Sequence, residues 1–152
     1  MRQFSLSANI EEGFASEAKY IVTPNARQVA EGIVNGFRSG VHSYTIIGSY
    51  GTGKSSFLLA LERDLMGGKQ YELLNPSELS EKKKFEVLKI VGDYKELSVL
   101  KGLADKLRIT VLLVHHTRKC KDNDPFNMIS GSAGISGCVD GSLVLIETKR
   151  GS

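Results

Sequence analysis

The chain has 152 residues, of which 41% are hydrophobic and 24% charged, and its formal net charge is +3. This length suits one domain with a real core, and so mild a charge permits a nucleic-acid partner without arguing for one. No apolar run approaches the roughly 20 residues that cross a bilayer, and the amino-terminal segment lacks the apolar stretch of a signal peptide. Cys120 and Cys138 have no metal-ligand or redox spacing and fit reduced thiols. We therefore expect one cytoplasmic domain over residues 1–152, with residues 1–22 as an amino-terminal extension and no membrane contact.

The first half of the chain predicts a helix, a strand and a second helix. Thr23-Pro24 reads as a capping residue followed by proline in the first turn, and the helical spacing of apolar residues ends at Gly40. Residues 43–47 form a short apolar, β-branched and aromatic run that is typical of a buried strand. A helix follows as far as Met66, where two glycines end it. Its apolar face consists of Phe57, Leu58, Leu61 and Leu65.

The second half predicts a strand over 85–91, a helix from about Tyr94 to Arg108, and strands over 109–115 and 142–147. The strand over 109–115 is almost continuously apolar, as in the middle of a parallel sheet. Residues 67–81 and 117–131 are polar and predict loops. Strands that alternate with helices indicate an α/β fold with a mostly parallel sheet and flanking helices. Ligands of such sheets bind at the carboxyl ends of the strands.

Residues 48–55 match the pattern G-x-x-x-x-G-K-S, which is the phosphate-binding P-loop. Glycines let the backbone N–H groups wrap closely around phosphate oxygens, while Lys54 supplies a charge for the β- and γ-phosphates and the Ser55 hydroxyl a ligand for Mg²⁺. The alternative, a glycine-rich turn with a surface lysine, is disfavoured by the strand before the motif and the helix after it. We therefore predict binding of ATP with Mg²⁺ by the loop and the residue that follows it: Gly48, Ser49, Tyr50, Gly51, Thr52, Gly53, Lys54, Ser55 and Ser56.

Two later stretches carry a resemblance to a known family. Residues 103–119 read Leu-Ala-Asp-Lys-Leu-Arg-Ile-Thr-Val-Leu-Leu-Val-His-His-Thr-Arg-Lys, and residues 124–145 begin Asp-Pro-Phe-Asn and pass through a Gly/Ser-rich turn into a strand. Both resemble the RecA-like ATPase core of RepA-type hexameric helicases. The resemblance covers about the last third to two-fifths of the chain, whereas the P-loop region resembles AAA-type ATPases more generally. It implies a RecA-like P-loop NTPase core, which here reads as incomplete by a strand and a helix.

The resemblance also implies roles for single residues. His116 occupies the position of a γ-phosphate sensor, and an imidazole can donate to a phosphate oxygen; a structural donor at a strand end is the alternative. Lys149 and Arg150 match a basic pair that reaches the nucleotide of a neighbouring subunit, which implies a homo-oligomer in a longer context. Catalytic roles are thus expected for Lys54, His116 and Arg150.

The chain departs from the family at the acidic residues. Asp93 is the one candidate for the aspartate that holds Mg²⁺ through water, and it fits equally well as the N-cap of the next helix. No glutamate stands out as catalytic base, and Glu72 and Glu78 are weak candidates. We therefore expect slow hydrolysis, with a non-hydrolysing ATP-binding module or a truncated or fused remnant as alternatives. Because the basic pair lies so near the end of the sequence, we expect a largely monomeric protein in isolation.

The loop after His116 is a candidate contact for single-stranded DNA. Arg118, Lys119 and Lys121 follow the strand end directly, where a γ-phosphate sensor could move them. A solvated loop with no partner is the alternative. The expected function is the ATPase core of a DNA-replication helicase or motor.

Overall fold

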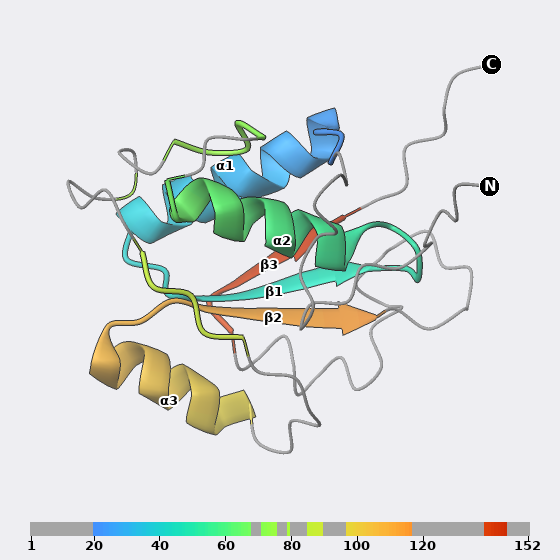
Figure 1. The fold of residues 1–152 in the computed structure, drawn as a ribbon. Helices are drawn as coiled ribbons and strands as arrows, with labels where there is room; N and C mark the ends of the chain where they lie inside the picture. Colours follow the sequence, from blue (N-terminus) through green and yellow to red (C-terminus); the bar gives the residue numbers. More distant parts are fainter. Residues whose placement is uncertain are drawn as a thin grey trace.

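The computed structural model describes residues 20–67, 71–75, 79, 85–89, 97–116 and 139–145. These contain the helices α1 (Pro24–Arg38), α2 (Lys54–Leu65) and α3 (Leu97–Leu107), and the strands β1 (Ser43–Gly48), β2 (Val111–His116) and β3 (Gly141–Val144). The strands form a parallel sheet in the order β2-β1-β3. Helices α1 and α2 lie on one side of the sheet and α3 on the other (Figure 1). The predicted α/β fold, with a parallel sheet and flanking helices, is confirmed for this part of the chain.

Helix α1 begins where its sequence predicts. The Thr23 side chain accepts a hydrogen bond from the backbone N–H of Ala26 at 3.1 Å, and Pro24 opens the first turn. Gly40 follows the end of the helix with a φ of +84°, a conformation that glycine adopts without strain. The buried face of the helix consists of Ala26, Val29, Ala30, Ile33 and Val34.

Strand β1 is buried along its whole length and is the centre of the fold. The side chains of Tyr44 and Ile46 belong to the core that α1 and α2 share with the sheet. The Tyr44 hydroxyl lies within hydrogen-bond distance of the carbonyl oxygens of Ile33 (3.1 Å) and Val41 (2.9 Å), to which its proton can be donated. Burial of this tyrosine therefore leaves its polar atom satisfied.

Helix α2 carries a fully buried carboxylate. Asp64 is 0% exposed and accepts backbone N–H bonds from Tyr71 (3.2 Å), Leu73 (2.7 Å) and Leu74 (3.4 Å). This side chain ties the segment 71–75 to the helix. The apolar face differs from the predicted one, because Phe57, Leu59, Ala60 and Leu61 are buried while Leu58 and Leu65 are only partly so. The segment held by Asp64 extends the apolar surroundings around the helix, since Leu73 joins the same core.

The strand predicted over 85–91 is wrong for the residues that can be compared. Residues 85–89 have no regular secondary structure, and both edges of β1 are already paired, with β2 and with β3. Lys89 instead forms an ion pair with Glu62 of α2 at 2.9 Å. Residues 90–96 lie outside the described part of the chain, so the predicted start of α3 at Tyr94 is not compared.

The two carboxy-terminal strands occur where they are predicted, with shifted ends. β2 begins at Val111 rather than at 109, and β3 runs from Gly141 to Val144, one residue earlier than the predicted start at 142. Leu145 is not part of the strand, and residues 146 and 147 lie outside the described part of the chain. Among the described residues, no helix has the length and apolar character needed to cross a membrane.

Candidate phosphate-binding site

The candidate site lies at the carboxyl edge of the sheet, where residues 49–53 connect β1 to α2. In the parallel register, Gly48 lies beside His116 of β2, and Ile47 lies beside Val144 of β3. The loop, the start of α2 and the ends of the strands are on the same side of the molecule in Figure 1. The sheet therefore positions the loop where α/β proteins bind their ligands.

Two glycines give the loop its path. Gly51 has a φ of +85° and Gly53 a φ of +83°. A Cβ atom at either position would meet nothing within 4 Å, so glycine is required here by the backbone conformation and not by crowding. Thr52 tightens the same turn, because its hydroxyl donates to the Ser49 carbonyl at 2.9 Å.

Gly48 is required for a different reason. A Cβ atom there would lie 2.6 Å from the carbonyl oxygen of Leu145 and 2.7 Å from the Thr52 hydroxyl oxygen. The backbone that leaves β3 thus packs directly against Gly48, the last residue of β1, after which the loop begins. Any side chain at Gly48 would push these two backbones apart.

Lys54 is a buried cation that has only neutral acceptors among the described residues. The residue is 3% exposed, and its ammonium group donates to the carbonyl oxygens of Gly48 (2.7 Å) and Ser49 (2.6 Å). The Thr52 hydroxyl is a third, longer contact at 3.5 Å. Burial lowers the pKa of Lys54, because desolvation disfavours the charged form. An anion beside this ammonium group would offset that cost.

The amino terminus of α2 adds to the positive potential. Gly53 is its N-cap, and no side chain caps the helix, in contrast to α1, which Thr23 caps. The first N–H groups of α2 and the positive end of its dipole therefore remain available next to Lys54. Ser55 and Ser56 are half-buried in this first turn, and Tyr50 is 80% exposed in the loop.

The chemistry of Mg²⁺ fits Ser55. This ion prefers hard oxygen ligands and usually keeps several waters, so the Ser55 hydroxyl could supply one of its ligands. Among the residues that the structure describes, no group of three or more His, Cys, Asp or Glu side chains could hold a metal ion. Asp93, the other expected Mg²⁺ ligand, lies outside the described residues.

The remaining predicted site residues are placed only in part. The backbone of His116 ends β2 beside Gly48, which brings this residue to the start of the loop. Arg150 and the candidate DNA contacts Arg118, Lys119 and Lys121 lie outside the described residues.

Sequence reasoning missed two residues that shape the surroundings of the loop. The Asn25 side-chain amide donates to the Val144 carbonyl at 3.3 Å, across 119 positions in the sequence, and Leu145 forms the wall against Gly48. Contacts between segments so far apart leave no local pattern in the sequence.

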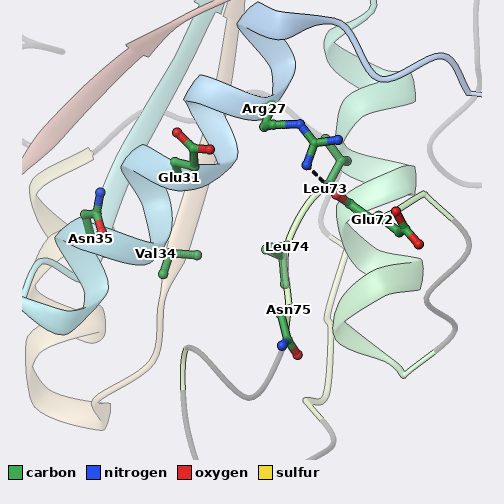
Figure 2. A pocket seen from close by; sticks show the side chains of 8 residues that line it. All are labelled: Arg27, Glu31, Val34, Asn35, Glu72, Leu73, Leu74 and Asn75. Atoms are coloured by element: carbon green, nitrogen blue, oxygen red, sulfur yellow. Dashed lines mark hydrogen bonds between the residues drawn. The ribbon is translucent and has the colours of Figure 1, made fainter.

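A separate pocket of about 340 Å³ lies between α1 and the segment 71–75 (Figure 2). Arg27 reaches across it from α1, and its guanidinium group donates to the Glu72 carbonyl at 3.1 Å. No residue of the loop lines this pocket, so it is not part of the candidate site. Its lining residues are Arg27, Glu31, Val34, Asn35, Glu72, Leu73, Leu74 and Asn75.

Comparison with known proteins identifies no relative. No family model matches the chain, and no curated protein or solved structure matches it significantly.

Proposed function

We propose that the chain is a RecA-like P-loop NTPase domain that binds ATP with Mg²⁺ at residues 48–56. The observation that carries this proposal is the buried Lys54 ammonium group, which lies beside the uncapped amino terminus of α2 and has only neutral acceptors in the described structure. A buried cation next to free N–H groups favours an anionic ligand. The G-x-x-x-x-G-K-S pattern makes a triphosphate the best match.

The residues of the loop have distinct roles in this proposal. The N–H groups at the start of α2 bind phosphate oxygens, and Lys54 exchanges the Gly48 and Ser49 carbonyls for the β- and γ-phosphates. Bound Mg²⁺ would supply charge neutralisation between these phosphates, with the Ser55 hydroxyl among its ligands. His116 would donate to the γ-phosphate while water attacks in line.

The biological setting rests on the sequence resemblance. By similarity to RepA-type helicases, we propose an ATPase core that acts in DNA replication, with Arg150 from a neighbouring copy completing the site. Arg118, Lys119 and Lys121 would contact single-stranded DNA through its phosphates, without regard to sequence.

A second candidate is an ATP-binding module with little or no hydrolysis. It is favoured by the segment 85–89, which was expected to lead into the acidic residue Asp93 as a strand but has no regular secondary structure. Single-turnover measurements with excess protein separate the two functions, because only an ATPase releases phosphate.

The test of nucleotide binding is calorimetry on Lys54→Ala. Loss of charge-assisted hydrogen bonds worth about 1.5–3 kcal/mol should weaken ATP binding about tenfold to a hundredfold. Lys106→Ala is the matched control, since Lys106 is exposed in the last turn of α3. Equal ATP affinity of Lys54→Ala and the parent would refute the proposal.

A further inference from the structure

Three contacts converge on the end of β3, next to the loop. The Leu145 N–H donates to the Ile47 carbonyl at 2.7 Å, which continues the pairing with β1 beyond the last residue of β3. The Leu145 carbonyl packs against Gly48 so closely that a Cβ there would lie 2.6 Å away. The Asn25 side-chain amide donates to the Val144 carbonyl at 3.3 Å. The amino-terminal end of α1, the loop and the end of β3 are on the same side of the molecule in Figure 1.

Asn25 makes its contact from a well-anchored position. It lies in the first turn of α1, where Thr23 already caps the helix by accepting the N–H of Ala26 at 3.1 Å, and the Arg27 N–H donates to the Thr23 carbonyl at 3.0 Å. Asparagine near a helix start is often a cap itself. Here the cap is supplied by Thr23, and the Asn25 amide donates to the Val144 carbonyl of the sheet.

Gly48, against which the end of β3 packs, also supplies an acceptor for Lys54. Gly48 contacts the Leu145 carbonyl, and its own carbonyl accepts from the Lys54 ammonium group at 2.7 Å. A displacement of the end of β3 would therefore leave the Gly48 peptide less well fixed. The phosphate loop would then have to be ordered when the ligand binds, which lowers affinity.

We propose that Asn25 is a positioning residue of the phosphate-binding loop, which keeps the end of β3 against Gly48 through the Val144 carbonyl. This rests on the proposed function, because it concerns the same site. Asn25 touches no reacting group in this scheme; it acts through Val144 and Leu145.

The test compares Asn25→Leu, which keeps similar volume but removes the donor, with Asn25→Ala and with the parent. Asn35→Leu is the control, because Asn35 lies on the same helix with an exposed side chain. Calorimetry with ATP and with inorganic tripolyphosphate should show affinity lowered about fivefold or more in both Asn25 variants, and by less than about twofold in the control. Both ligands should be affected alike, because the phosphates are what the loop holds.

Amide exchange supplies a readout that does not depend on the variants folding. In the parent, ATP should slow exchange of the Leu145 N–H, because the end of β3 becomes fixed when the loop is occupied. Parent-like affinity of both Asn25 variants, or Leu145 exchange that ATP leaves unchanged, would overturn the inference while leaving ATP binding intact. A parent that binds neither ATP nor tripolyphosphate would instead refute the proposed function, and the inference with it.

Discussion

Gly48, the last residue of β1, lies directly beside His116, the last residue of β2, in the parallel register of the two strands. Both strands therefore end at the same level of the sheet. The start of the phosphate loop and the residue expected to sense the γ-phosphate are brought together by the backbone alone. This relationship does not depend on where the imidazole points.

We expect His116→Ala to bind ATP nearly as well as the parent and to hydrolyse it more slowly. The reason is that a sensor acts on the γ-phosphate in the transition state, whereas in the proposed site the loop and Lys54 would supply the binding energy. Basal turnover of the parent should itself fall well below the ~1–100 s⁻¹ of efficient phosphoryl-transfer enzymes. Phosphate release and calorimetry measure the two effects. His42→Ala is the control because His42 precedes β1 at the opposite end of the strand, and unchanged turnover of His116→Ala would count against the sensor role.

Gly53→Ala should weaken ATP binding and destabilise the fold by about 1–2 kcal/mol, because a Cβ at a φ of +83° is strained although nothing crowds it. Gly102→Ala, in the interior of α3, should stabilise by about 0.5–1 kcal/mol through helix propensity, since a Cβ there also meets nothing within 4 Å. The urea midpoint of unfolding should therefore fall for Gly53→Ala and rise for Gly102→Ala, relative to the parent. Destabilisation of both by the same amount would show that the loop conformation is not the cause.

The sequence predicts the elements whose signals are local. Thr23-Pro24 and Gly40 mark the limits of α1, and the apolar run from Ser43 and the glycines of the loop place β1 and α2 within a residue or two of their observed ends. Caps, turns and buried strands are determined by neighbouring residues, so they can be read from one chain. The apolar run that becomes β2 is predicted for the same reason, with its start displaced by two residues.

The features that the sequence does not predict depend on contacts between distant segments. Residues 85–89 have the composition of a strand but no regular secondary structure, and they are not paired with β1, whose two neighbours are β2 and β3. Strand composition shows only that a segment would suit a half-buried sheet, and tertiary context decides whether it pairs. The buried carboxylate of Asp64 binds backbone N–H groups of a segment that has no periodic pattern, and the Asn25–Val144 contact joins opposite ends of the chain. Side-chain to backbone bonds of this kind depend on tertiary structure, which composition and spacing do not encode.

Asp64→Asn should destabilise the protein by roughly 1–3 kcal/mol, because an amide NH₂ would face backbone N–H donors and leave at least one of them unsatisfied. The Leu73 N–H, at 2.7 Å from the carboxylate, is the closest of these donors. Urea unfolding measures the loss. Asp105→Asn is the control, since Asp105 is exposed on α3, and equal stability of the two variants would contradict the role given to Asp64.

Binding of single-stranded DNA should require Arg118, Lys119 and Lys121 and should weaken steeply as salt is raised. Contacts to phosphates release counterions, so each lost contact lowers the dependence of affinity on salt. Reversal of all three charges should therefore remove both the binding and its salt dependence, as fluorescence anisotropy would show. Reversal of Lys82, Lys83 and Lys84, an equally basic run elsewhere in the chain, is the control. Binding that ignores salt, or that survives reversal of the first set, would refute the contact.

Stability in acid should depend on Asp140, which lies at the amino-terminal ends of β1 and β3, whereas the loop follows the carboxyl end of β1. The carboxylate accepts hydrogen bonds from Lys101 at 2.5 Å and from the Ser43 hydroxyl at 2.6 Å, so it links α3, β1 and the start of β3. These bonds, that from Lys101 first, lower the pKa of Asp140 from 3.8 to about 2. Because the pKa is lower in the folded state, the carboxylate contributes stability above its unfolded value of 3.8, and this contribution is lost as the pH falls through about 2.

Urea midpoints of the parent should thus fall more steeply between pH 3.8 and about 2 than those of Asp140→Asn, which has no proton to gain there. Asp105→Asn should follow the parent, and parallel curves for the parent and Asp140→Asn would show that the ion pair contributes nothing to folding.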